Sequence, residues 1–230
     1  MNAMPNSGKE LAVTVEGKSY QRIPVKTHVV QRGEVLLDFL SQYVKPNLQA
    51  GDMVAMSERV IAIMQGRSFP LEDIKPGPWA RFLYKFVTKS PHGIGLASPF
   101  TMQKALEEVG LPRILIAALV AAITKPLGMR GLFYHVAGRA VAGIDGPCDF
   151  TLPPYNRAVT LAPAKPAKVA AEVSAALGVP FFVIDANDLG VEVLGSAPRG
   201  ASVDLVKALF ADNPLGQTNE QTPLAIIRPE

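Results

Sequence analysis

The sequence predicts an α/β (α+β) protein in which mixed sheets pack against helices. Short apolar runs rich in β-branched residues alternate along the chain with segments of helical spacing. Of the 230 residues, 48% are hydrophobic and 19% are charged, a balance that can bury a sizeable core. The longest apolar run, residues 114–123, is shorter than the roughly 20 residues that a membrane span needs, so a buried helix is the better interpretation.

Five segments are expected to be strands because they are apolar and rich in β-branched residues. In chain order they are 20–30, 52–64, 132–144, 179–185 and 223–228. The first is expected to turn near Lys26. The polar pair Ser57 and Glu58 interrupts the second, and the third is expected to be two strands that turn at Gly138.

Six segments have the spacing or the apolar composition of helices. In chain order they are 35–43, 79–87, 99–109, 114–123, 167–177 and 203–210. Pro46 ends the first helix. Ser98 is the expected N-cap of the third, with Pro99 at the first helical position. For the domain organisation, we expect a disordered tail at 1–8 and one domain at 9–230, with 70–130 as a helical insertion or subdomain.

Charge and cysteine content exclude several classes of protein. With 23 Lys and Arg against 20 Asp and Glu, the net charge of +3 does not indicate nucleic-acid binding. A single cysteine, Cys148, excludes an internal disulfide and is typical of a reducing compartment. The first ten residues lack the apolar core of a secretory signal. We therefore expect a cytoplasmic protein with neither nucleic acid nor membrane as a partner.

Two acidic turns are the strongest candidates for chemistry. Asp145 lies in AGIDG and Asp185 in FVIDAND, each after an apolar run that is expected to be a strand. Ligands of α/β sheets commonly bind beyond strand ends. If the two carboxylates converge, they call for Mg²⁺ or Mn²⁺ with phosphate oxygens as further ligands. The alternative, which spacing alone favours, is that each Asp caps a turn or a following helix.

Two polar segments are weaker candidates. Segment 23–28 is a strand edge with one cation and one hydroxyl, which suits a base or a phosphate, although a solvated edge strand looks the same. Segment 216–223 is dense in small and polar residues whose backbone N–H groups can cradle an anion, or it is a plain surface loop. The chain has no G-x-x-x-x-G-K-[ST] phosphate loop.

These segments, in this order, resemble the coenzyme F-420:L-glutamate ligase family, also called F-420-0:gamma-glutamyl ligases. The similarity lies in IPVKTHVV (23–30), GDMVAMSERVIAIMQGR (51–67), AGID (142–145) with VIDAN (183–187), and GQTNEQTPLAII (216–227). The resemblance implies a homodimeric enzyme that uses GTP or ATP and Mg²⁺ or Mn²⁺. Such an enzyme adds glutamate, or a similar amino acid, to a small acidic acceptor such as a deazaflavin coenzyme precursor.

The resemblance also assigns candidate site residues, while the catalytic residues stay unassigned. The implied metal ligands are Asp145 and Asp185. The implied nucleotide-binding residues are Pro24, Val25, Lys26, Thr27, His28, Ser57, Glu58, Asn187 and Glu220.

Three positions keep an alternative open. Ile63, Ala186 and Gln217 stand where the family has Lys, Thr and Glu. The alternative is a non-catalytic or repurposed relative that binds a metabolite, or that binds a partner protein through the apolar middle third. A further interpretation is a shared fold with unrelated chemistry in the same cleft.

Overall fold

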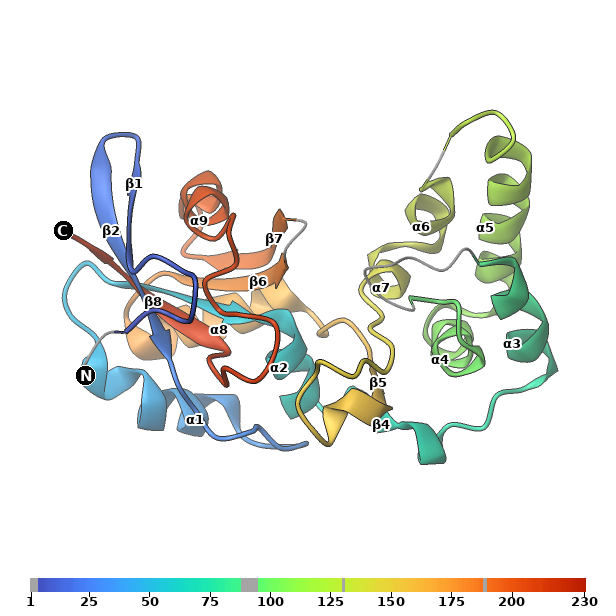
Figure 1. The fold of residues 1–230 in the computed structure, drawn as a ribbon, viewed down its shortest axis with the longest axis horizontal. Coiled ribbons are helices and arrows are strands. Elements are labelled where there is room, and N and C mark those ends of the chain that lie inside the picture. The colour runs from blue at the N-terminus through green and yellow to red at the C-terminus, as the bar shows by residue number, and fades with distance from the viewer. Residues whose placement is uncertain (1–3, 88–94, 130, 188–189) are drawn as a thin grey trace. The chain divides into compact units, whose positions relative to one another are not determined.

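The computed structural model describes residues 4–87, 95–129, 131–187 and 190–230 (Figure 1). Strands and helices are mixed along the chain, which confirms the predicted α/β class. The chain divides into two compact units, unit 1 with residues 1–65 and 163–230, and unit 2 with residues 66–162. The expected domain limits, including the insertion at 70–130, stay a prediction. Within the described ranges, no helix is both long and apolar enough to span a membrane.

Unit 1 is built on a six-stranded sheet in the order β1-β2-β8-β3-β6-β7. The strands are β1 (Ala12–Val15), β2 (Lys18–Val25), β3 (Met53–Ser57), β6 (Phe181–Asn187), β7 (Gly190–Ala197) and β8 (Leu224–Pro229). β8 is antiparallel to both β2 and β3, and β3 is parallel to β6. The carboxyl ends of β2, β3 and β6 therefore lie at one end of the sheet, where the chain also enters β8.

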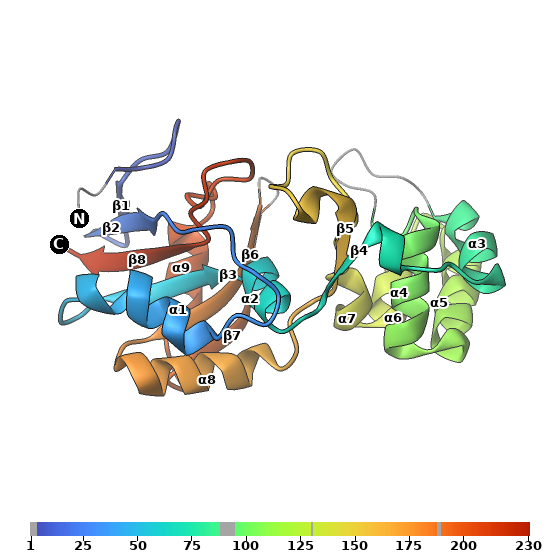
Figure 2. The same cartoon turned by 90° about the horizontal axis from the view of Figure 1, so that it is seen from below.

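Helices cover both faces of this sheet. They are α1 (Leu36–Tyr43), the short 3₁₀ turn η1 (Lys45–Asn47), α2 (Glu58–Met64), α8 (Pro166–Leu177) and α9 (Val203–Leu209). On one face, Val206 and Leu209 of α9 form a core cluster with Phe182 and Ile184 of β6. Figures 1 and 2 show α1 and α8 on the opposite face from α9.

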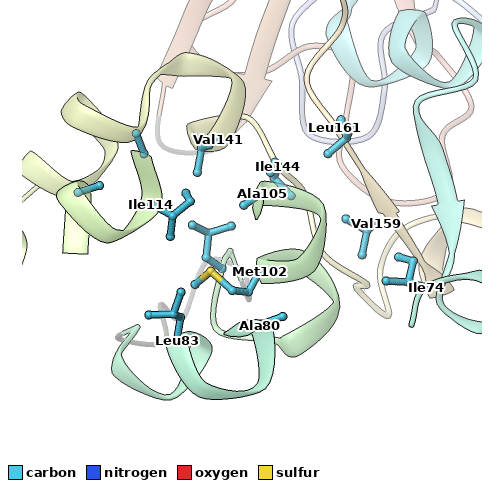
Figure 3. Close-up of a cluster of buried hydrophobic side chains, with 13 residues drawn as sticks. Ile74, Ala80, Leu83, Met102, Ala105, Ile114, Val141, Ile144, Val159 and Leu161 are labelled. Atoms are coloured by element: carbon cyan, nitrogen blue, oxygen red, sulfur yellow. The ribbon is translucent and has the colours of Figure 1, made fainter. Parts of the chain in front are cut away.

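Unit 2 is mainly helical. It contains β4 (Ser68–Pro70), η2 (Leu71–Asp73), α3 (Pro78–Leu83), η3 (Tyr84–Phe86), α4 (Pro99–Val109), α5 (Leu111–Thr124), α6 (Leu132–Ala137), α7 (Arg139–Ala142), η4 (Tyr155–Arg157) and β5 (Ala158–Thr160). β4 and β5 pair as a small antiparallel sheet. Unit 2 has its own core cluster, which includes Leu83, Met102, Ile114 and Val141 from four different helices (Figure 3).

The start of α4 confirms the expected cap. The Ser98 hydroxyl accepts a hydrogen bond from the backbone N–H of Phe100 at 3.2 Å, and Pro99 occupies the first helical position. The helix ends at Val109, where Gly110 takes a φ of +82°. Both signals are local to the chain, because they depend on backbone groups left without helical partners.

Two of the predicted strand segments are wrong. Segment 52–64 is a strand only to Ser57, and α2 begins at Glu58. Segment 132–144 forms α6 and α7 instead of two strands, with Gly138 at φ +95° between them. Strands β1, β4, β5 and β7 were not anticipated, and the first predicted strand ends at Val25.

Candidate functional site

Unit 1 contains every predicted site residue except Asp145, and it gathers them at one end of the sheet. Pro24 and Val25 end β2, and Lys26, Thr27 and His28 follow directly. Ser57 ends β3 and Glu58 begins α2. Asp185 and Asn187 lie in the last three residues of β6, and Glu220 lies in the loop before β8. The sheet end thus combines segments from four distant parts of the chain.

The polar loop 216–223 is attached to two strand ends by backbone hydrogen bonds. Thr27 donates its N–H to the carbonyl of Gln221 at 2.9 Å, and Ser57 donates to the carbonyl of Pro223 at 2.8 Å. Thr27 and Thr222 are both buried. The loop is therefore a fixed part of the sheet end, which favours the binding-loop interpretation over a plain surface loop.

Glu220 folds back onto this loop. Its carboxylate accepts hydrogen bonds from the backbone N–H of Thr218 at 2.8 Å and from the Thr218 hydroxyl at 2.9 Å. Burial alone would raise the pKa of the Glu220 carboxyl, but hydrogen bonds from the backbone and from Thr218, with the charge of Lys9, hold that pKa below its ordinary value. Gly216, at φ +78°, makes room, since a Cβ there would lie 2.5 Å from the Glu220 Cδ.

The N-terminal segment holds the same loop, and sequence reasoning missed this. The Asn6 side-chain amide donates to the carbonyl of Pro214 and to the hydroxyl of Thr222, both at 2.8 Å. Thr222 in turn donates to the carbonyl of Leu215 at 2.7 Å. Asn6 lies within the expected tail 1–8, of which residues 1–3 lie outside the described residues.

His28 is held by two side chains that were not predicted. Its Nδ1 lies 2.7 Å from the Tyr43 hydroxyl, and its Nε2 lies 2.8 Å from a carboxylate oxygen of Glu34. The rings of Phe39 and Tyr43 lie against the imidazole, with centroids 5.6 and 5.5 Å away. A nucleotide contact by His28 therefore involves a ring whose orientation is already set by α1 and the loop before it.

Asp185 lies inside β6 rather than beyond its end, so the acidic turn expected there is wrong. In the register of β6 with β7, Asp185 stands opposite Glu192, and both carboxylates project from the same face. The side-chain amide of Asn187 lies 3.4 Å from the Asp185 Oδ1. Carboxylate and amide oxygens of this kind are ligands that Mg²⁺ and Mn²⁺ accept.

Asp145 lies in unit 2 and is exposed. It follows α7 instead of the expected strand. Its backbone pairs with Thr160 of β5 through two hydrogen bonds of 2.8 and 2.9 Å. Asp145 belongs to unit 2 and Asp185 to unit 1, so a metal site that the two carboxylates share stays a prediction. Within the described residues, no group of three or more His, Cys, Asp and Glu side chains is arranged to hold a metal ion.

Two of the altered positions face the protein interior. Ile63 of α2 is only 3% exposed, and Ala186 of β6 packs against the core cluster under α9. Ile63 therefore belongs to the core and cannot contact a phosphate group. A cation for a phosphate would have to come from another residue of the sheet end, such as the exposed Lys26.

The fold and the sheet end define an α/β protein with a candidate ligand site where strand ends and one polar loop converge. The family model described as F420-0:Gamma-glutamyl ligase matches residues 24–183, and the chain belongs to this family. The matched range includes Lys26, Ser57 and Asp145 but stops before Asp185 and Glu220. No curated protein matches the chain. Membership confirms the family resemblance and supports a glutamate-adding, nucleotide-dependent ligase role in F420 biosynthesis.

Proposed function

We propose that this protein is a nucleotide- and metal-dependent ligase that adds glutamate, or a similar amino acid, to a small acidic acceptor such as a deazaflavin coenzyme precursor. The observation that carries the proposal is the convergence of β2, β3, β6 and the loop 216–223 at one sheet end. The family resemblance lies in these elements, in α2 that follows β3, and in the segment AGID (142–145) of unit 2. We further propose that the ligase is a cytoplasmic homodimer.

The chemistry needs an activated acceptor. Transfer of the γ-phosphoryl group of GTP or ATP to the acceptor carboxylate gives an acyl phosphate. The amine of glutamate then attacks the acyl carbon, the amide bond forms, and phosphate leaves with the electron pair of the broken C–O bond. In such a transfer the protein mainly positions the groups and neutralises charge. Lys26 supplies a cation at the end of β2, and Ser57 supplies a hydroxyl at the end of β3.

Asp185 and Asp145 would hold the Mg²⁺ or Mn²⁺. When bound, the ion neutralises part of the charge on the nucleotide phosphates. The oxygen donors of Asp185, with Glu192 opposite it, suit such a hard cation.

Thermal unfolding of the full chain tests nucleotide binding. With GTP or ATP and Mg²⁺ or Mn²⁺ at about 100 times Kd, binding to the native state adds about 2.7 kcal/mol and should raise Tm by about 5–11 °C. The Lys26→Met variant should lose most of this shift. Lys45→Met, which removes an exposed lysine of η1, is the matched control and should keep it. If no nucleotide–metal pair shifts Tm, the proposal fails.

Turnover is measured by incorporation of labelled glutamate into a deazaflavin precursor. We expect incorporation that needs both nucleotide and metal and that falls by at least about tenfold in Asp185→Asn, which retains the size of the side chain but not its charge.

The alternative function is a non-catalytic relative that binds a metabolite or a partner protein. The burial of Ile63 in the core favours it, since the family has a Lys at that position. Nucleotide-dependent stabilisation without any glutamate incorporation would establish this alternative. Incorporation that Asp185→Asn abolishes would exclude it.

A further inference from the structure

Positive charge is concentrated in one stretch of unit 2. Residues 74–144 contain nine Lys and Arg and two acidic residues, Glu107 and Glu108, a difference of +7. The whole chain has a difference of +3, so the remaining residues carry −4. Both acidic residues are in ion pairs, Glu107 with Lys104 and Glu108 with Arg67, each at 2.6 Å. Charge asymmetry of this kind indicates an anionic partner.

The helix α5 is apolar on both of its sides. Ile114 and Ala117 are buried in the core of unit 2, whereas Leu119 and Ile123 on the opposite side are 63% and 59% exposed. Leu127, just beyond the helix, is 68% exposed. A helix that is hydrophobic all round is normally covered on all sides. We therefore expect a binding partner to cover the exposed side of α5.

Aromatic side chains of α3 and η3 add to this exposed surface. Trp79, Phe82 and Phe86 are each at least half exposed, and the last two rings pack edge to face with centroids 5.1 Å apart. The exposed cations Arg81 and Lys85 lie between them in sequence. Both α3 and α5 pack on α4, and Figures 1 and 2 show both at the same side of unit 2.

The α3–α5 surface is the set Trp79, Phe82, Phe86, Leu119, Ile123 and Leu127, with its neighbouring cations. Nucleic acid would satisfy the cations but offers nothing to the aliphatic side chains of α5. A second copy would cover the apolar groups but would bring two basic surfaces together. An anionic lipid surface satisfies both, because Trp, Phe and Leu enter the interface while Lys and Arg meet the headgroups.

We propose that the α3–α5 surface binds the surface of membranes that contain anionic phospholipid. With 14 residues, α5 is about 21 Å long and lies in the plane of the interface, since a span needs roughly 20 apolar residues. Membrane attachment through unit 2 is independent of the nucleotide chemistry proposed for unit 1. It differs from the expectation that the protein has no membrane partner, which was based on an apolar run too short to span a bilayer.

Sedimentation of the full chain with vesicles tests this proposal. Vesicles of equal parts phosphatidylserine and phosphatidylcholine should bind the protein, and vesicles of phosphatidylcholine alone should bind it far more weakly. Each neutralised cation, as in Arg81→Gln or Lys85→Gln, should weaken binding about fivefold, and added salt should weaken it further. The double variant Leu119→Gln/Ile123→Gln should weaken binding at least about tenfold.

The matched control is Leu37→Gln, which alters an exposed apolar residue of α1 in unit 1 and should leave vesicle binding unchanged. All variants should keep the circular dichroism and the nucleotide-induced Tm shift of the natural sequence. Absence of binding to anionic vesicles overturns the proposal. Two further measurements identify the occupant of the surface if vesicles do not bind. If light scattering shows a dimer that Leu119→Gln/Ile123→Gln dissociates, the surface binds a second copy of the chain. If the protein binds RNA but not vesicles, the surface binds nucleic acid.

Discussion

The ion pair between Asp52 and Arg228 should be a main stabilising contact at the centre of the unit 1 sheet. Asp52 precedes β3 and is fully buried, and Arg228 lies in β8. The guanidinium donates from Nε to Oδ1 at 2.9 Å and from Nη2 to Oδ2 at 2.8 Å. This contact with Asp52 raises the pKa of Arg228, although burial acts against it. The arrangement is the bidentate geometry that makes arginine pairs strong.

Both partners also bond to the backbone, so each variant leaves other groups unsatisfied. Asp52 accepts the N–H of Gln49 at 2.8 Å, and Arg228 donates to the carbonyl of Asn47 at 2.9 Å. Arg228→Met leaves a buried carboxylate without its cation and should destabilise the protein by about 3–5 kcal/mol. Asp52→Asn keeps an acceptor for Gln49 and should cost about 2 kcal/mol.

A double-mutant cycle isolates the pair. The Asp52→Asn/Arg228→Met double variant should lose at least about 1 kcal/mol less stability than the sum of the two single variants, because each single change leaves the opposite partner unpaired and the double change leaves neither. Native-state hydrogen exchange of the β3 and β8 amides gives the local free energies. The exposed pair Lys168–Glu172, at 3.5 Å, is the control cycle and should give about 0.3–0.5 kcal/mol. A coupling for the buried pair no larger than that of the control would refute the reasoning.

Three further predictions concern backbone fit, acid sensitivity and helix capping. Gly195→Ala should lower the free energy of unfolding by about 3 kcal/mol in urea titrations, because the new Cβ would lie 2.4 Å from the backbone oxygen of Pro166. Thr218→Val should raise the pKa of Glu220 toward the ordinary value of a glutamate carboxyl in NMR titrations, because the hydroxyl that donates to the carboxylate is lost. Since the folded pKa of Glu220 lies below the unfolded one, its stabilising effect is present above the unfolded pKa and is lost as the pH falls through the folded pKa, and this loss should shrink in the variant. Ser98→Ala should cost about 1 kcal/mol in thermal unfolding and lower exchange protection at the start of α4, and an unchanged Tm would contradict the capping role.

Local signals in the sequence predicted most of the helices. The cap at Ser98 and Pro99 needs only neighbouring backbone groups, so a short window contains the whole signal. The strand prediction for segment 132–144 is wrong because the deciding contact there is not local. Its aromatic and β-branched residues favour strands, yet α6 packs beside α5, and this tertiary contact overrides the propensity.

The hairpin of β1 and β2 shows a signal that was present but not used. Glu16 and Gly17 both take positive φ angles, 50° and 77°, between two alternating segments. An acidic residue followed by glycine suits such a tight turn. The β6–β7 pair, by contrast, depends on a register shift after Val183, which no sequence pattern marks.

The candidate site was predicted in part. The resemblance assigned residues at the ends of β2, β3 and β6, and the sheet topology brings these ends together. The supporting contacts of Asn6, Glu34 and Tyr43 were missed, because each joins segments with no recognisable spacing. The pairing of Asp145 with Asp185 could not be judged from the sequence, since the two residues belong to different units and no local pattern relates them.

The position of β8 has a consequence for biosynthesis. This strand is translated after every other strand of its sheet, yet it is inserted between β2 and β3. During translation, the nascent β2 and β3 edges must stay apart and soluble until β8 leaves the ribosome, while the continuous segment 66–162 has already been released. A stalled or prematurely terminated chain would present two unpaired strand edges, which are the features that chaperones and aggregates both recognise.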